Sequence, residues 1–218
     1  MGILAPSILA ADFTNLEQQI KLVENGGADW IHCDIMDGHF VPNITFGPLV
    51  VESAKRSTNL PLDVHLMIEN PDNFLGDFIK AGADYLSVHL EVVEDLKRTI
   101  RRIKELGAKA GVVINPATPV SSIKAIANQI DLFLIMTVNA GFGGQEFIPN
   151  SLQRINEAVD LRKESGADFL IEIDGGVNVE TAQQAFQAGA EVFVAGTSIF
   201  NANNITEAVR EIKTVISK

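Results

Sequence analysis

The sequence predicts an α/β protein that folds as a single-domain barrel of eight parallel strands, a (β/α)8 or TIM barrel, over residues 1–218. Three observations predict this fold. Eight short apolar runs recur along the chain, segments with helical spacing of apolar residues separate them, and a Gly-Ala step leads from helix to strand five times. A length of 218 residues suits one large α/β domain, and no linker is visible.

The predicted strands are rich in β-branched residues, and they alternate with predicted helices throughout the chain. Leu16, Ile20 and Val23 show helical spacing after the first strand, and residues 96–106 show it after the fourth. Eight is the strand number of a closed parallel barrel. The predicted strands are Ile3–Leu9, Trp30–Met36, Leu62–Met67, Tyr85–Leu90, Ala110–Ile114, Leu132–Val138, Phe169–Ile173 and Val192–Ala195.

The Gly-Ala steps indicate which end of the barrel carries the irregular loops. Glycine suits the left-handed residue that closes a helix, and alanine lets the chain turn tightly into the sheet. Because these steps lie between helix and strand, the irregular loops follow the strands, at the face where such barrels carry their sites. A doubly wound open sheet would also alternate strands and helices, but eight open strands are uncommon in so short a chain. The steps begin at Gly27, Gly82, Gly107, Gly166 and Gly189.

Composition excludes several classes of function. A formal net charge of −11 argues against sequence-independent binding to nucleic acid, which needs a basic surface. No apolar stretch reaches the roughly 18 residues that span a bilayer, and the N-terminus lacks the pattern of a signal peptide. The single cysteine, Cys33, is expected to pack inside a strand. We therefore expect a cytoplasmic protein with no nucleic-acid or membrane partner.

Two predicted strands carry the same arrangement of chemical groups. Side chains alternate across a strand, so His32, Asp34 and Met36 share one face, and in the next strand Asp63, His65 and Met67 do the same. The following loops begin with turn residues such as Asp37-Gly38. A matching pair of strand ends of this kind is hard to explain by packing alone.

Four of these strand-end residues predict a metal centre. With Asp174 at the end of the seventh strand, His32, Asp34 and His65 would form a set of two imidazoles and two carboxylates at one rim. Such a set suits Zn²⁺, Fe²⁺, Mn²⁺ or Co²⁺ and leaves positions for substrate oxygens. Taken singly, a strand-end aspartate is more often a helix cap and a lone histidine more often a satisfied, half-buried residue. The shared position of all four favours function.

The methionines share the same position. Apart from Met1, the chain contains only Met36, Met67 and Met136, and each lies near the carboxyl end of a predicted strand. Flexible thioethers often fill gaps in a core. Their common position instead indicates a polarisable, uncharged lining over a planar, electron-rich intermediate.

Glycine-rich loops after the last three strands predict an anion site. No Lys or Arg lies between Lys124 and Arg154 or within residues 164–209, so backbone N–H groups must hold the anion. This position matches the phosphate site common in such barrels and indicates a phosphorylated small molecule. The predicted residues are Gly141, Phe142, Gly143 and Gly144, then Gly175 and Gly176, then Gly196, Thr197 and Ser198.

Other polar residues are expected to have lesser roles. Ser7 faces the site and can hydrogen-bond a substrate hydroxyl, but it has no paired base and is not expected to be a nucleophile. His89 and Glu91 are expected to support the site, and His39 is expected to lie on the surface.

Along nearly its whole length the chain resembles the ribulose-phosphate 3-epimerase family. That resemblance implies a (β/α)8 barrel that interconverts D-ribulose 5-phosphate and D-xylulose 5-phosphate in the pentose phosphate pathway. It also implies one divalent metal bound by the four residues above, and a homo-oligomer. The family pattern usually has proline where this chain has Ala140. The motifs that carry the resemblance are residues 5–9, 32–43, 63–67, 115–119, 141–145, 174–177 and 195–197.

The chemistry of such an epimerisation assigns roles to two carboxylates. Inverting a carbon beside a ketone requires removing its proton, which forms an enediolate, and returning a proton to the other face. We expect Asp34 to be the base and Asp174 the acid in the ribulose-to-xylulose direction, and we expect His65 and Asp174 to contact the substrate as well. An epimerase for a six-carbon ketose phosphate such as allulose 6-phosphate remains an alternative, and so does a non-catalytic sugar-phosphate binding barrel.

Overall fold

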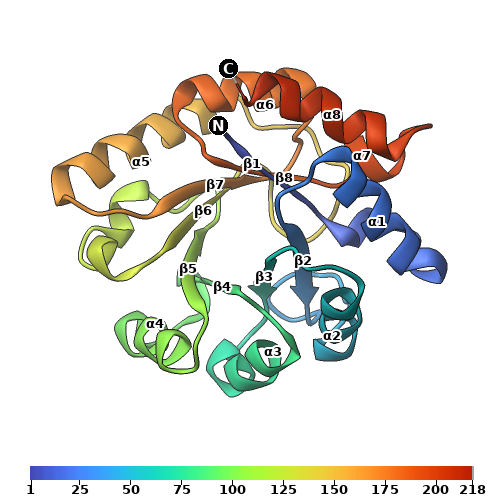
Figure 1. The fold of residues 1–218 in the computed structure, drawn as a ribbon. Helices are drawn as coiled ribbons and strands as arrows, with labels where there is room; N and C mark the ends of the chain where they lie inside the picture. Colours follow the sequence, from blue (N-terminus) through green and yellow to red (C-terminus); the bar gives the residue numbers. More distant parts are fainter. Residues whose placement is uncertain (218) are drawn as a thin grey trace.

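Eight parallel strands form one sheet that curves into a barrel with helices on its outside (Figure 1). The computed structural model describes residues 1–217, so Lys218, the last residue of the predicted domain, lies outside the described residues. The strand order β1-β8-β7-β6-β5-β4-β3-β2 confirms the predicted TIM barrel and excludes the doubly wound sheet, whose order reverses at a switch point. The strands are β1 Ile3–Pro6, β2 Ile31–Met36, β3 Leu62–Met67, β4 Tyr85–His89, β5 Lys109–Ile114, β6 Leu132–Met136, β7 Leu170–Asp174 and β8 Val192–Ala195.

Most strands begin and end within two residues of their predicted bounds. The largest difference is at β1, which was expected to reach Leu9 but ends at Pro6. The Ser7 hydroxyl accepts a hydrogen bond from the Leu9 N–H at 3.3 Å, and the chain turns there into a 3-10 helix at Ile8–Ala10. The change of direction keeps Ser7 at the rim of the barrel.

The connection between β5 and β6 departs from the predicted alternation. It contains two 3-10 helices, at Val120–Ile123 and Ala127–Gln129, so the prediction of an α-helix after every strand is wrong here. Pro119 has an extended backbone, and the residues after it close turns of the 3-10 type, such as Ser122 N–H to the Pro119 carbonyl and Lys124 N–H to the Ser121 carbonyl. In residues 1–217 no helix is long and apolar enough to cross a membrane. The α-helices are α1 Leu16–Gly26, α2 Pro48–Ser57, α3 Leu75–Ala81, α4 Leu96–Glu105, α5 Ser151–Ser165, α6 Val179–Ala188, α7 Thr197–Phe200 and α8 Ile205–Val215.

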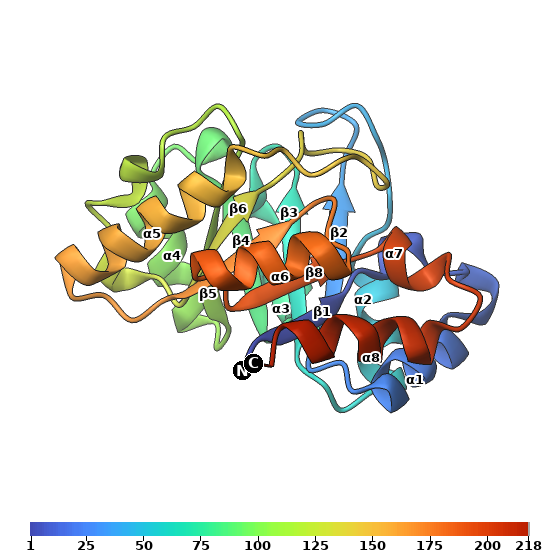
Figure 2. The ribbon, with the colours of Figure 1, turned by 90° about the horizontal axis from the view of Figure 1, so that it is seen from above.

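The five glycines of the Gly-Ala steps end helices, as predicted. Their φ angles lie between 62° at Gly166 and 115° at Gly82, in the left-handed region that closes a helix. Figure 2 shows the barrel from the side, with both termini near one end and long loops at the other. The strand-to-helix loops are therefore gathered at the end that carries the site.

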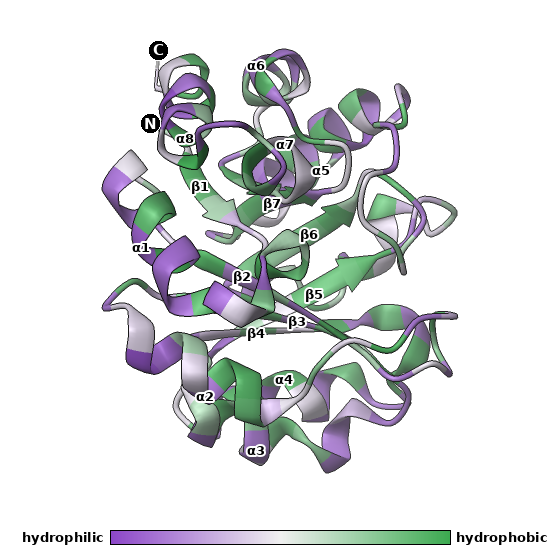
Figure 3. Ribbon diagram, turned by 90° about the vertical axis from the view of Figure 1, so that its right-hand side faces the viewer, coloured by the Kyte–Doolittle hydropathy of each residue, from purple (hydrophilic) through white to green (hydrophobic). Residues whose placement is uncertain are grey.

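The apolar core lies mainly between the strands and the helices. Ile31, Cys33 and Ile35 of β2 point into this layer, as the alternation predicted. Figure 3 shows the sheet mostly in the hydrophobic colour and the outer sides of the helices in the hydrophilic colour. Inside the barrel, Trp30 and Tyr85 stack with their ring centroids 4.3 Å apart and close the amino end of the strands.

One seam of the barrel is weaker than the others. A single β-bridge, Ser7–His32, joins the end of β1 to β2, whereas every other two adjacent strands are joined by three to six paired residues. Below this bridge the Leu4 carbonyl accepts hydrogen bonds from the N–H groups of Asp29 and Trp30. The bridge at the carboxyl end joins two residues of the candidate site.

Candidate metal centre and active site

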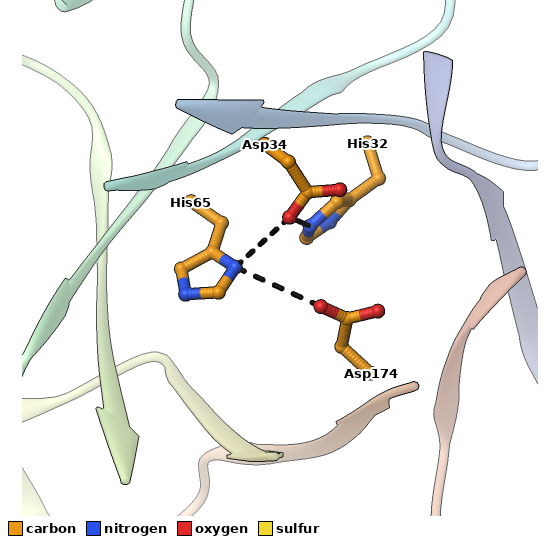
Figure 4. A group of neighbouring side chains, drawn as sticks. All are labelled: His32, Asp34, His65 and Asp174. Atoms are coloured by element: carbon orange, nitrogen blue, oxygen red, sulfur yellow. Dashed lines mark hydrogen bonds and ion pairs between the residues drawn. The ribbon is translucent and has the colours of Figure 1, made fainter. Parts of the chain in front are cut away.

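Four side chains converge at the carboxyl end of the strands (Figure 4). His32 and Asp34 come from β2, His65 from β3 and Asp174 from the last position of β7. Asp34 Oδ1 lies 3.2 Å from both His32 Nε2 and His65 Nδ1, and Asp174 Oδ2 lies 3.8 Å from His65 Nδ1. Metal–ligand bonds of about 2.0–2.1 Å in a tetrahedral site separate the ligand atoms by about 3.3 Å. The ligand atoms of the four residues all lie within 4.8 Å of one another, so together they could hold one divalent cation.

His32 is held from behind by two buried acids. Its Nδ1 lies 2.5 Å from Asp63 Oδ2 and 3.8 Å from Glu172 Oε1, and all three side chains are fully buried. Burial opposes a charge on His32, but Asp34 and Asp63 outweigh it and raise the pKa of this imidazole well above its usual range, so both ring nitrogens are protonated without metal. When a metal is bound, a proton on Nδ1 alone would leave Nε2 free as the ligand, the arrangement that carboxylates impose on metal-binding histidines. Burial, and then the charge of Asp63, raises the pKa of Glu172 well above its usual range, so this acid is protonated. The sequence pattern placed Asp63 on the same strand face as His65 but included neither Asp63 nor Glu172 among the site residues.

His65 is held by a third imidazole. Its Nε2 lies 2.9 Å from His89 Nε2, and His89 Nδ1 lies 3.1 Å from Glu91 Oε2. Burial lowers the pKa of His89 to about 4. Burial opposes ionisation of Glu91, but hydrogen bonds from His89 and from the loop after β5 outweigh it and lower the pKa of Glu91 to about 2. A neutral imidazole therefore bonds an ionised carboxylate behind His65.

Without metal, the pKa values of the two candidate acid–base residues are shifted in opposite directions. Burial opposes ionisation of Asp34, but the charge of His32 and its hydrogen bond outweigh burial and hold the pKa of that carboxyl well below its usual range. Burial and the charge of Asp34 raise the pKa of Asp174 to about 8. The Ser7 hydroxyl donates a 2.6 Å hydrogen bond to Asp34 Oδ2. Two carboxyl groups whose pKa values diverge in this way suit a base and an acid in one site.

A cavity of about 740 Å³ opens above the metal centre. Met36, Met67 and Met136 line it together with Asp34 and Asp174. His65, expected to contact substrate, lies beneath this lining and is fully buried. The other predicted substrate residues all line the cavity: Ser7, Gly141, Phe142, Gly143, Gly144, Gly175, Gly176, Gly196 and Thr197.

The glycine-rich end of this cavity offers N–H donors without cations. The described residues that line it include no Lys or Arg. Within residues 1–217, the N–H groups of Gly143, Gly144, Gly176 and Gly196 donate no hydrogen bond to another backbone group. A Cβ atom added at Gly144 would lie 3.7 Å from the Thr197 methyl group, so the loops after β6 and β8 approach each other closely. The arrangement suits a small anion held by backbone donors.

Side-chain hydrogen bonds hold the loop after β6, which contains Ala140. The Gln145 amide donates to the carbonyl oxygens of Asn139 at 2.7 Å and of Phe142 at 2.9 Å. Asn43, from the loop after β2, donates to the Gly141 carbonyl oxygen at 3.0 Å. These bonds restrain the loop.

Two residues expected to lie outside the chemistry do so. Cys33 is fully buried on the outer face of β2, and burial raises the pKa of its thiol to about 12, which confirms a packing role. The side chain of His39 is 72% exposed, which confirms its place on the surface.

Comparison with known proteins relates this geometry to one enzyme family. A model described as "Ribulose-phosphate 3 epimerase family" matches residues 3–200. A ribulose-phosphate 3-epimerase of Bacillus subtilis is 56% identical over 211 residues, which covers 96% of this chain and 97% of the relative. The chain belongs to the ribulose-phosphate 3-epimerase family. Membership makes it an epimerase, as its motifs predicted.

Further similarities agree with this family and with the fold. A chloroplastic ribulose-5-phosphate-3-epimerase of Arabidopsis thaliana is 52% identical and covers 97% of this chain and 76% of the relative. The solved structure of orotidine 5'-phosphate decarboxylase from Pyrococcus horikoshii matches with a TM-score of 0.74 at 19% identity, covering 99% of this chain and 100% of that one. At that identity the likeness shows a shared barrel fold.

Proposed function

We propose that this member of the ribulose-phosphate 3-epimerase family interconverts D-ribulose 5-phosphate and D-xylulose 5-phosphate by proton transfer at carbon 3. The observation that carries the proposal is the pair of carboxyl groups, Asp34 and Asp174, that line one cavity and belong to the same four-residue metal-binding group. An ionised carboxylate accepts the carbon-bound proton, and a carboxylic acid returns a proton to the opposite face of the resulting enediolate.

The two carboxyl groups take different roles in the proposed reaction. Asp34 takes the proton from ribulose 5-phosphate, and the 2.6 Å hydrogen bond from Ser7 keeps its carboxylate oriented toward the cavity. Asp174, which lines the same cavity from β7, gives a proton to the other face. In the xylulose-to-ribulose direction the two residues exchange roles.

The metal site completes the proposed chemistry. His32, Asp34, His65 and Asp174 would hold one divalent cation, and their mixed nitrogen and oxygen donors accept Zn²⁺, Fe²⁺, Mn²⁺ or Co²⁺. When bound, such a cation stabilises negative charge on the substrate oxygens as a Lewis acid. Met36, Met67 and Met136 cover the same space with uncharged, polarisable groups.

The glycine-rich end of the cavity is the proposed binding site for the phosphate, at the opposite end of the substrate from the metal. The unpaired N–H groups of Gly143, Gly144, Gly176 and Gly196 would hold the phosphate, and the binding energy gained there would place carbon 3 between the two acids. We further propose a cytoplasmic homo-oligomer, which a sizing run would test. The location is supported by the single, buried Cys33.

The test is proton NMR of ribulose 5-phosphate in D₂O with metal-loaded protein. Deuterium should enter carbon 3 as xylulose 5-phosphate accumulates, and Asp34→Asn or Asp174→Asn should lower that rate by at least 100-fold, because each removes a proton-transfer group. If carbon 3 stays unexchanged with all four metals, the five-carbon assignment fails and allulose 6-phosphate becomes the next substrate. Tight binding with no proton exchange for either sugar would identify a non-catalytic sugar-phosphate protein.

A further inference from the structure

A continuous chain of hydrogen bonds leads from His65 away from the metal site. His65 Nε2 lies 2.9 Å from His89 Nε2, so one of these nitrogens donates and the other accepts. His89 Nδ1 lies 3.1 Å from the Glu91 carboxylate, which only accepts, so Nδ1 carries the His89 proton. His89 Nε2 is then the acceptor and His65 Nε2 the donor. This leaves the His65 Nδ1 lone pair 3.2 Å from Asp34 Oδ1, a contact between two acceptors that a cation bound between them would relieve.

Glu91, at the far end of this series of hydrogen bonds, determines which atoms donate and which accept. Glu91 Oε1 accepts hydrogen bonds from the Asn115 N–H at 2.8 Å and from the Thr118 hydroxyl at 2.5 Å. A peptide N–H can only donate, so this oxygen must remain an acceptor. Arg154 of α5 donates in turn to the carbonyl oxygens of Asn115, at 3.0 Å, and Pro116. The motif at residues 115–119, which has no place in the proton-transfer chemistry, is thereby tied to Glu91.

Water cannot readily replace the middle of this chain. His89 is fully buried, and the Phe40 ring packs against it with a centroid distance of 4.6 Å. The His65 and His89 rings stack with their centroids 5.0 Å apart. His32, the other imidazole of the site, instead meets the Asp63 carboxylate directly. The two histidines therefore depend on different partners.

We propose that His89 and Glu91, held by the Asn115–Thr118 loop, are positioning residues that keep His65 in the tautomer whose Nδ1 is free to bind the metal. The inference rests on the proposed metal-dependent function and adds to it the residues that prepare one ligand. Positioning partners of metal-binding histidines typically change metal affinity 10- to 100-fold when replaced.

Glu91→Gln tests the direction of the chain. The glutamine must turn its amide oxygen to the Asn115 N–H, so its NH₂ group faces His89 Nδ1 and donates to it. His89 then donates from Nε2, His65 accepts there, and the His65 proton moves to Nδ1. We expect Zn²⁺ affinity to fall about 10- to 100-fold. His89→Phe should lose the same affinity, whereas His89→Gln should recover much of it, because its amide oxygen can replace Nε2 as acceptor.

The measurements are Zn²⁺ competition with a chromophoric chelator and ¹⁵N NMR of the histidine rings, on the full chain. The matched control is Glu164→Gln, since Glu164 pairs with Lys124 at 3.7 Å on the exposed surface. Weakened Zn²⁺ binding by Glu91→Gln, with the metal-free His65 ring protonated at Nδ1, would support the proposal. Because Glu91→Gln preserves shape, it keeps the test valid if His89→Phe fails to fold.

The opposite results separate two failures. If Glu91→Gln binds Zn²⁺ as tightly as the wild type, or if His65 stays protonated at Nε2, the positioning role is wrong while the epimerase proposal stands. If the wild-type chain binds no Zn²⁺, Mn²⁺, Fe²⁺ or Co²⁺ at His65, both the metal-dependent proposal and this inference fall together.

Discussion

Replacing Gly176 with alanine should damage the phosphate end of the site far more than the fold. Gly176 has a φ angle of 67°, and a Cβ atom there would lie 2.4 Å from the backbone nitrogen of Phe147 and 2.7 Å from its Cα. Backbone atoms cannot rotate aside, and real Cβ contacts essentially never fall below 3.0 Å. The segment that leads from Gly143 and Gly144 to Phe147 must therefore shift.

Two separate costs follow from this geometry. The left-handed backbone costs alanine about 1 kcal/mol of folding free energy. The displaced loop also moves the donors that would hold the phosphate, and a misplacement of about 1 Å can cost about 100-fold in rate. We expect kcat/KM for ribulose 5-phosphate to fall about 100-fold, or about 2.7 kcal/mol of transition-state stabilisation.

Gly166→Ala is the matched control. Gly166 has a φ angle of 62°, but nothing lies within 4 Å of the position of its Cβ, at the end of α5. In urea unfolding both variants should lose about 1 kcal/mol from the left-handed backbone, and Gly176→Ala should lose more because of its clash with Phe147. Only Gly176→Ala should also lose kcat/KM and sensitivity to inhibition by inorganic phosphate. Equal kcat/KM values for the two variants would refute the assignment of the glycine loops to the phosphate.

Three further outcomes are expected. In the metal-free protein the pKa of Asp174 is raised to about 8, so the folded chain keeps a proton there that the unfolded chain releases near the usual pKa of 3.8. The free energy of unfolding, relative to Asp174→Asn, should therefore fall as pH rises from about 4 to about 8. A difference in unfolding free energy that does not vary with pH would contradict this. Removing metal with a chelator should abolish epimerisation. Zn²⁺ or Mn²⁺ at about 100 times its Kd should restore activity and add about 2.7 kcal/mol to the free energy of unfolding. A chelated enzyme that keeps its rate would rule out a role for the metal in the reaction. Asp63→Asn should weaken Zn²⁺ binding about 10- to 100-fold, because it changes the partner that orients His32. The control is Asp29→Asn, which removes an ion pair with Lys213 at the amino end of β2. It should leave the Zn²⁺ affinity unchanged in the same chelator competition.

Strand pattern and turn chemistry were sufficient to predict the barrel. The two-residue period placed Ile31 and Cys33 toward the helices and His32 and Asp34 toward the interior, because alternation is a local property of a strand. The segment after β5 was harder to predict, since the apolar spacing of Val120 and Ile123 resembles a helix while the backbone forms 3-10 turns.

The residues that contact the metal-site histidines could not be predicted from local sequence patterns. Alternation predicts which face Asp63 occupies, but its depth in the barrel depends on the register of β2 against β3, which pairs His32 with Asp63 and Asp34 with His65. Glu172 likewise reaches His32 only because the barrel closes on itself, which brings β7 close to β2. Such contacts follow from the stagger of the whole sheet and leave no mark in a short stretch of sequence.

The weak seam between β1 and β2 has a consequence for heat inactivation. Ser7 and His32 form its single bridge, and Ser7 also binds the proposed base, Asp34, across it. Local opening of a protein begins where the fewest bonds must break. Partial opening at this seam would separate Ser7 from Asp34 while the other strand ladders stay closed. We therefore expect hydrogen exchange on warming to rise first at the amides of Asp29 and Trp30, which donate to the Leu4 carbonyl across this seam, and catalysis to fail at a temperature where most of the barrel is still folded.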